Sequence, residues 1–427
     1  MNEPLIPTRR LRRKAEAYAT MSSCCGMIGE VTLTDSAIII LFAGMLGAGD
    51  MLAMITTSLL PLLTGVCIIP MAALAARIGI RRQILIAIGI STAAYFAAAA
   101  SPFFGNWNVS VLIAAILCFA FSLTGYIAGW YPMLDTFLTS EHRTVFFSRM
   151  RFCHQLCATG FLLIVGLIIG KAPSLTALQT VLLVSGVIFT GRGWCIARIP
   201  DLPPPHREKR GLREGLARAV ANKPLMGFST YISVLNLACF GTIPLMILTL
   251  KNRFEAPDNI IVLVSAATLC GMLAGYLCAN RIFHRLGLKY FLIVFHLMFL
   301  LINLALFCFD HGNPLNYLLI AALLFAYNFG IAAISIASSA EMMALAQPGN
   351  KVMAMAVNGA YASGGAGLSR LLSSLLLGCG LIAPEWRFGT VTVSRYQSLL
   401  LIYIFALLFA AAFLLLIDFH GRRPAES

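Results

Sequence analysis

The feature that most constrains this chain is a series of long apolar runs separated by short polar breaks. A helix that crosses hydrocarbon needs about 20 mostly apolar residues, and each run is long enough. We therefore predict an all-α membrane protein with twelve transmembrane helices. The runs lie near 19–46, 52–76, 83–104, 109–137, 152–170, 175–197, 224–250, 259–283, 289–309, 314–340, 352–383 and 396–417.

Composition agrees with this prediction, because 59% of the 427 residues are hydrophobic and only 11% are charged. A soluble domain carries roughly 25% charged residues. The net charge of +14 does not indicate nucleic-acid binding, because the bases lie in short segments between apolar runs rather than on one soluble face. We therefore expect a lipid bilayer around the chain and no nucleic-acid partner.

Most of the 31 Lys and Arg residues lie in alternate breaks, counted from the N-terminus. Cytoplasmic loops carry an excess of these residues. The pattern predicts a multi-pass protein of the inner (plasma) membrane with both termini in the cytoplasm. The basic stretch from Arg9 to Lys14 is not followed by a compact apolar core with a cleavage site, so we expect no removable signal peptide.

Cysteine and histidine usage gives no sign of a metal site or a disulfide framework. The 12 cysteines are scattered, and no Cys-x-x-Cys pair or Cys/His cluster is present. His-Glu-x-x-His, a serine–lysine pair and nucleotide-binding signatures are also missing. We therefore expect no enzyme activity, no cofactor and no metal.

A polar central segment divides the chain. We predict an N-terminal six-helix bundle at 1–197, a cytoplasmic linker at 198–223, and a C-terminal six-helix bundle at 224–427. The prolines at 200–205 exclude a helix interior there. The part after them is either a solvated linker or a short basic helix on the membrane surface, with Leu212, Leu216 and Val220 on its apolar stripe.

The two halves contain similar stretches at 76–86 and 284–294, each between the second and third helices of its half. Arg77 corresponds to Arg285, and Gly79 corresponds to Gly287. Internal repeats of this kind are common in secondary transporters. Each glycine allows a tight reversal that needs unusual backbone angles, and the bases can bind the carbonyls at helix C-termini.

With these stretches, the chain resembles the major facilitator superfamily over nearly its whole length. The family signature after the second helix is Gly-x-x-x-Asp-Arg-x-Gly-Arg-Arg. The chain has Ala72, Ala76, Arg77, Gly79, Arg81 and Arg82 in the corresponding stretch, so the first glycine and the aspartate are missing. In the family that aspartate helps to latch the two halves together on the cytoplasmic side. Asp135 or Glu341 are candidate substitutes as partners of Arg77 or Arg285.

Polar residues near the middle of the predicted helices are costly in hydrocarbon and therefore indicate function. Glu30, Tyr126, Asn236 and Asn328 lie at similar depth on the first, fourth, seventh and tenth predicted helices. The resemblance implies that these four helices line a central cavity. We predict that Tyr126, Asn236 and Asn328 contact a solute there.

Arg370 is the strongest single signal, since it lies far from either end of the eleventh predicted helix. A guanidinium at that depth needs a carboxylate or an anionic ligand. Three interpretations remain open: an ion pair that joins the two halves, with Glu30 or Asp35 as partner; direct contact with a solute; and a helix that lies at another depth. The small residues at 359–367 indicate close packing of this helix against a neighbour.

Glu30 also has two interpretations, a proton carrier that couples transport to a gradient and a structural ion pair. The sequence favours a monomeric secondary transporter that moves a small organic solute by alternating access. One alternative is a proton-driven antiporter for drugs or metabolites, which predicts a large apolar cavity. The other is a receptor or assembly protein that does not transport, on the same scaffold.

Overall fold

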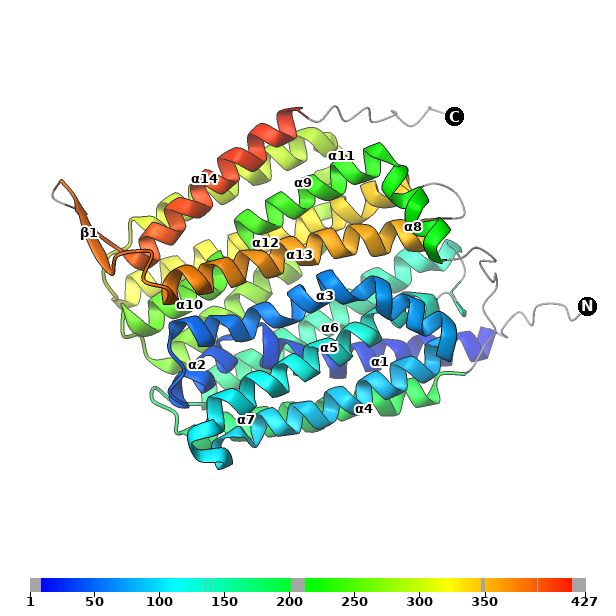
Figure 1. The fold of residues 1–427 in the computed structure, drawn as a ribbon, viewed down its shortest axis with the longest axis horizontal. Helices are drawn as coiled ribbons and strands as arrows, with labels where there is room; N and C mark the ends of the chain where they lie inside the picture. Colours follow the sequence, from blue (N-terminus) through cyan, green and yellow to red (C-terminus); the bar gives the residue numbers. More distant parts are fainter. Residues whose placement is uncertain are drawn as a thin grey trace, which may run out of the picture.

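The computed structural model describes residues 9–134, 136–138, 140–200, 212–346, 350–389 and 391–416. Over these residues the protein is a bundle of long helices with one short hairpin (Figure 1). The helices of the first half are α1 Arg9–Thr34, α2 Ala37–Met45, α3 Asp50–Ile78, α4 Ile80–Ala99, the 3-10 helix η1 Ser101–Trp107, α5 Asn108–Leu134, α6 Ser140–Ile168 and α7 Leu175–Arg198. They are followed by α8 Leu212–Ala221, α9 Lys223–Cys239, α10 Thr242–Asn252, α11 Asp258–Phe307, α12 Pro314–Leu345, α13 Lys351–Gly378, the strands β1 Glu385–Phe388 and β2 Val391–Ser394, and α14 Arg395–Leu416.

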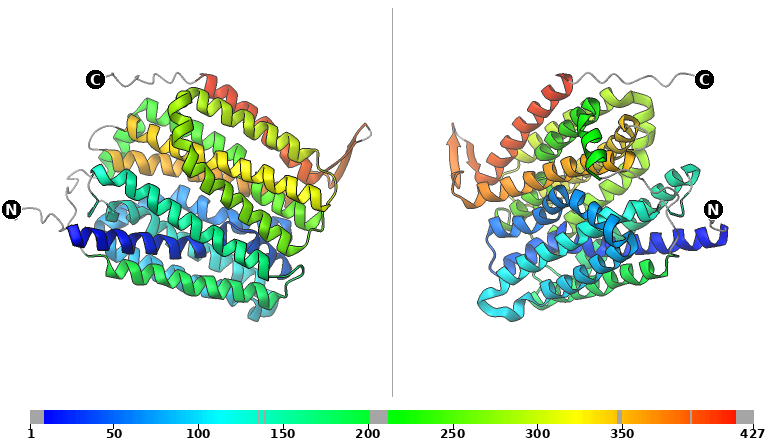
Figure 2. Two further views of the ribbon diagram at one scale, coloured as in Figure 1. Left: turned by 180° about the vertical axis from the view of Figure 1, so that it is seen from behind. Right: turned by 45° about the vertical axis from the view of Figure 1, so that its right-hand side comes forward.

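The helices group by their place in the sequence. In Figures 1 and 2, α1–α7 lie together in one part of the molecule and α9–α14 in the other. We call these the N-terminal set and the C-terminal set. They meet chiefly where α3 packs on α13 and α6 packs on α11. The hairpin β1–β2 projects from one end of the molecule and α8 lies toward the opposite end, so we call these the hairpin end and the α8 end (Figure 1).

The protein is a multi-span helical protein, but the predicted count of twelve spans is not confirmed. Among the described residues, ten helices are long and apolar enough to cross a membrane. The count becomes eleven if the pair Arg10–Thr34 and Ala37–Met45, bent by 43°, is one span. The helix α13 is 28 residues long and is not among these helices, since asparagine, serine and arginine residues interrupt its apolar sequence.

Two predicted runs are broken within their length. The run at 19–46 is interrupted at Asp35 and Ser36, between α1 and α2. The run at 224–250 is interrupted at Phe240 and Gly241, between α9 and α10. At the second break Tyr403 lies so close to Gly241 that no side chain fits there. The second break lies four residues before Pro244, so the carbonyl of Phe240 has no helical N–H partner.

The repeated turns have the predicted backbone geometry. Gly79 ends α3 with φ 93°, and Gly287 kinks α11 with φ 70°. Both φ angles lie in the left-handed region, which residues other than glycine rarely adopt. Arg81 donates to the carbonyl of Ala197 at 2.8 Å, near the C-terminus of α7, so a base of this turn binds a helix end as expected.

The short helix α8 forms after the central prolines, but its packed face differs from the predicted stripe. Gly215 and Ala219 are buried, whereas Val220 is 53% exposed. The amide of Asn350 donates to the carbonyl of Gly215 at 2.9 Å, which places α8 against the start of α13. The helix therefore packs through Gly215 and Ala219 together with Leu216 of the predicted stripe.

The small residues of α13 pack as predicted. A methyl group on Gly367 would lie 2.5 Å from the backbone nitrogen of Leu62 in α3, so only glycine allows this contact. On another face of α13, Gly365 lies against the backbone of Ser233 in α9. The helix α13 is thus held closely by both sets.

Candidate functional site

Arg370 lies between the two sets, and its side chain is 7% exposed. Its Nη2 donates to Asp35 Oδ1 at 2.6 Å, at the break between α1 and α2. Its Nη1 donates to the carbonyl of Thr57 at 2.8 Å, and its Nε donates to the carbonyl of Phe240 at 3.2 Å. Of the two predicted carboxylate partners, Asp35 is therefore the one that Arg370 binds.

The two carbonyls that Arg370 binds share one cause. Thr57 lies four residues before Pro61, and Phe240 lies four residues before Pro244. A proline has no N–H, so the carbonyl four residues earlier loses its helical partner. An unpaired carbonyl in a membrane interior costs several kcal/mol. Arg370 supplies both missing donors and keeps a third for Asp35.

A second buried arginine, Arg192 of α7, was not singled out by the sequence. It forms an ion pair with Glu30, and the side chains of the two residues are 3% and 20% exposed. Its guanidinium lies 4.2 Å from the centre of the Tyr126 ring, which is a cation–π contact. A methyl group on Gly26 would overlap this guanidinium, so the missing side chain of Gly26 makes the space for it.

The two ion pairs are connected by the end of one helix. Glu30 belongs to the last turns of α1, and Asp35 directly follows the helix end. Glu30 and Asp35 are five residues apart, which corresponds to about 7.5 Å along a helix. Arg192 approaches Glu30 from the N-terminal set, and Arg370 approaches Asp35 from the C-terminal set. The end of α1 thus carries two carboxylates, each neutralised by an arginine from a different set.

The structure brings only some of the predicted contact residues together. Tyr126 lies with Glu30 at Arg192, and its ring centre is 5.3 Å from that of Trp130. The Asn236 amide donates to the carbonyl of Ala362 at 3.0 Å, on α13 and two turns before Arg370. Asn328 is elsewhere, because its amide joins α12 to α11 through the carbonyl of Thr268 at 2.9 Å.

The predicted latch is not seen in the part of the chain that the structure describes. Arg77 and Arg285 are exposed, and no ion pair joins either of them to Glu341 among the described side chains. Asp135 lies outside the described residues. The described part of the chain therefore shows the tight turns at Gly79 and Gly287 without an ion pair between Arg77 or Arg285 and Glu341.

Polar contacts between the sets continue to the hairpin end. Asp50, the first residue of α3, accepts hydrogen bonds from Asn252 at 2.5 Å, from Arg395 at 2.7 Å and from Tyr396. The hydroxyl of Ser374 donates to the carbonyl of Met51 at 2.8 Å. These contacts hold the start of α3 against α10, α13 and α14.

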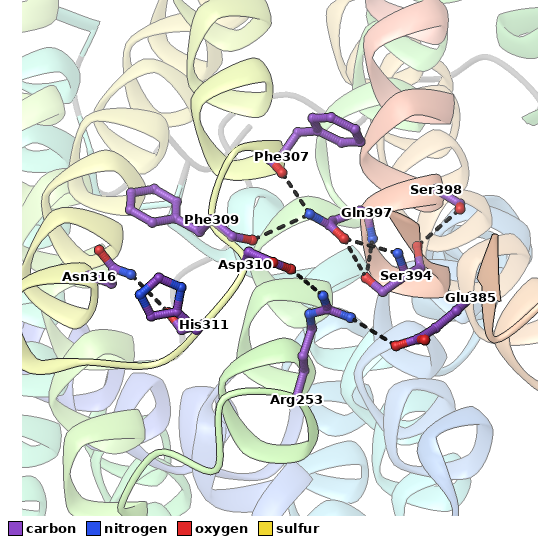
Figure 3. A network of polar contacts seen from close by, with 10 residues as sticks. All are labelled: Arg253, Phe307, Phe309, Asp310, His311, Asn316, Glu385, Ser394, Gln397 and Ser398. Carbon is purple, nitrogen blue, oxygen red and sulfur yellow. Dashed lines mark hydrogen bonds and ion pairs between the residues drawn. The ribbon is translucent and has the colours of Figure 1, made fainter. Parts of the chain in front are cut away.

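A neighbouring network stays within the C-terminal set (Figure 3). Arg253 contacts Asp310 at 2.5 Å and Glu385 of the hairpin at 3.8 Å. The amide of Gln397 donates to the carbonyl of Phe307 at 2.9 Å and accepts from Ser394. This network fixes the hairpin on α10 and on the end of α11.

The described residues contain no group of three or more His, Cys, Asp or Glu side chains placed to hold a metal ion. The site consists instead of guanidinium, carboxylate, phenol and backbone carbonyl groups. Such groups bind and orient a polar or charged solute by hydrogen bonds and charge.

The sequence model of the Major Facilitator Superfamily matches residues 21–370 of this chain. The chain belongs to the major facilitator superfamily. Members of this superfamily and the structural neighbours are membrane transporters rather than enzymes. No curated protein sequence matches the chain.

Solved structures of superfamily transporters have the same fold. A mutant of the nucleoside transporter NupG superposes with a TM-score of 0.71 at 13% identity, covering 95% of this chain and 99% of that chain. A bacterial homologue of the human lysosomal transporter Spinster, inward-facing and unoccupied, gives 0.66 at 12% identity, covering 95% and 97%. An outward-facing bacterial homologue of the iron transporter ferroportin gives 0.62 at 14% identity, covering 95% and 98%.

Proposed function

We propose that this chain is a secondary active transporter that moves a small polar organic solute across the inner membrane by alternating access. The observation that carries the proposal is the pair of buried arginines, Arg192 and Arg370, at the end of α1. Transporters commonly place their solute site at interrupted helices between two similar sets of helices. Here the breaks at Asp35 and Phe240 both meet Arg370.

The topology that fits this proposal has twelve spans, with α13 as the span that composition alone misses. It comprises bundles at 1–197 and 224–427 and a cytoplasmic linker at 198–223. The α8 end faces the cytoplasm together with both termini, as the distribution of Lys and Arg predicts. In this orientation the contacts of Asp50 and Arg370 hold the two sets together on the external side.

The polar character of the site favours a solute with an anionic or polyhydroxylic group over a drug. A drug antiporter needs a large apolar cavity with little polar lining. Arg370 instead donates to three acceptors, and Arg192 contacts Glu30 and Tyr126. When either ion pair opens, its guanidinium becomes available to a carboxylate, a phosphate or hydroxyl groups. Tyr126 and Asn236 remain the proposed polar contacts of the solute, whereas Asn328 is bonded to Thr268 apart from them.

Glu30 is the proposed coupling residue. Its carboxylate is paired with Arg192, so it can carry a proton only while the pair is open. The Glu30 side chain is more exposed than that of Arg192, at 20% against 3%, so Glu30 is the member that a proton can reach. We propose that the pair opens and closes in each transport cycle and so links solute movement to the proton gradient.

The test is a thermal-shift screen of purified protein at two pH values, followed by uptake into liposomes. Nucleosides, the solutes named for NupG, are a suitable first class because they are polyhydroxylic, and organic anions are the second. We expect a ligand that stabilises wild type but not Arg370→Ala, and that accumulates in liposomes. If the ligand stabilises wild type and Arg370→Ala equally, Arg370 does not contribute to solute binding. Binding without flux would favour a receptor.

A further inference from the structure

A groove on the membrane-facing surface of the C-terminal set lies apart from the site described above. It runs between α11 and α14, which pack against each other, and encloses about 240 Å³. Its walls are aliphatic, and several of them are exposed: Leu297 is 55% exposed, Leu408 48% and Leu415 66%. Both helices are long and apolar enough to cross a membrane, so these leucines face acyl chains.

One polar side chain lines this groove. His296 is 4% exposed, and its ring stacks on Tyr231 with 5.8 Å between ring centres. Its Nδ1 lies 2.8 Å from the carbonyl of Leu292. A carbonyl only accepts, so Nδ1 carries the hydrogen. Because burial among leucines disfavours a charged ring, Nε2 is left with a free lone pair.

That Nε2 atom is buried and has no hydrogen-bond partner among the described residues, so a ligand reaches it only when side chains of the groove shift. His296 is the central residue of the candidate span Arg285–Phe307, so it lies near the middle of a ~30 Å hydrocarbon core. Water is scarce at that depth, so an unpaired acceptor there is costly and unusual. A ligand that supplies a donor would remove this cost.

From this geometry we propose that the groove between α11 and α14 binds an apolar molecule dissolved in the bilayer, through a hydroxyl group that donates to His296 Nε2. The donor must be neutral, because an ammonium is too costly to bring to this depth. The volume is below the ~300–1,000 Å³ of most small-molecule pockets, so one chain or ring enters and the remainder stays in the bilayer. The proposal does not depend on which solute the central site carries.

The test uses a photoreactive alkylphenol with a diazirine in its tail, added to the full-length protein in nanodiscs. We expect labelling of the segments 293–300 and 407–415, mapped by peptide mass spectrometry. Unlabelled 4-dodecylphenol should compete at a concentration about fivefold to tenfold lower than its methyl ether, which lacks the donor. Equal competition by the phenol and the ether, or labelling only outside these segments, would overturn the proposal.

Two variants separate the hydrogen bond from the shape of the groove. His296→Phe keeps an aromatic ring beside Tyr231 but removes the acceptor, so the phenol and the ether should compete equally. Ala411→Leu narrows the groove and should reduce labelling by both probes. Gel filtration and thermal unfolding of both variants check that they fold. A preference for the phenol that survives in folded His296→Phe would also exclude this site.

Discussion

Arg370 and Asp35 form an ion pair at 2.6 Å in which the arginine side chain is 7% exposed and the aspartate side chain is 49% exposed. The pair joins the N-terminal set to the C-terminal set at a place where the helices of both are interrupted. Only the arginine is buried, so the loss of one partner has different consequences for the two residues. Asp35 can stay hydrated without its partner, whereas Arg370 cannot.

This asymmetry gives a prediction for stability. Asp35→Ala leaves a buried cation without its carboxylate, and we expect a loss of about 3 kcal/mol in the free energy of unfolding. In an Arg370→Met background the same change should cost far less, because no buried charge is left behind. Unfolding in detergent by increasing SDS measures all four proteins of this double-mutant cycle. An equal cost of Asp35→Ala in both backgrounds would contradict a stabilising pair.

Gly26 makes a second prediction, because its missing side chain leaves the space that the Arg192 guanidinium occupies. Gly26→Ala should displace the guanidinium from Glu30 and Tyr126, lower the melting temperature and reduce transport. Gly160→Ala in α6 is the matched control, since nothing lies within 4 Å of the added methyl group. It should be neutral or slightly stabilising, because alanine favours helix over glycine. Similar losses in the two variants would show that the Arg192 contact is not the cause.

The proposed coupling role of Glu30 predicts a split between two transport assays. In liposomes, Glu30→Gln should still exchange internal solute for external solute, because exchange needs no net proton movement. Accumulation driven by a proton gradient should fail. Glu16→Gln is a suitable control, since Glu16 lies on the same helix and pairs with Arg12 at 3.7 Å in a more exposed position. Normal accumulation by Glu30→Gln would show that Glu30 does not couple transport to the proton gradient.

The contacts of Asp50 predict a change in accessibility at the hairpin end. Asp50→Asn weakens the bonds from Arg395 and Tyr396, so the start of α3 should separate more often from α14. A cysteine placed at Ser374, in a protein otherwise free of cysteine, should then react faster with a maleimide. Asp310→Asn is the control, because Asp310 pairs with Arg253 within the C-terminal set. If the cysteine reacts equally fast in Asp50→Asn and in Asp310→Asn, the contacts of Asp50 do not control access to the hairpin end.

The helical architecture could be predicted from the length of the apolar runs, because hydrocarbon allows few other structures. The turns at Gly79 and Gly287 could also be predicted, since a base-rich reversal needs a residue that adopts positive φ. The hairpin at 385–394 was not predicted. Its two strands have four residues each, which is too short for alternation to be distinguished from a loop.

The site itself could be predicted only in part. Arg370 stood out because it lies deep in a span, and Asp35 was one of two possible partners for it. Arg192 was missed because it lies within two turns of the end of α7, where an arginine side chain can reach the headgroups. Its inward direction depends on Gly26 and Glu30 of another helix, which one-dimensional spacing does not reveal. The prolines at 61 and 244 did carry a signal, since each frees a carbonyl that a deep arginine can bind.

The β1–β2 hairpin has a practical consequence, because it projects beyond the helices at one end of the molecule (Figure 1). A protease or an antibody fragment directed at these strands reports which compartment that end faces, without any change to the helices. Intact cells and inverted vesicles would give opposite answers. The hairpin can therefore be used to determine the orientation of the protein in the membrane.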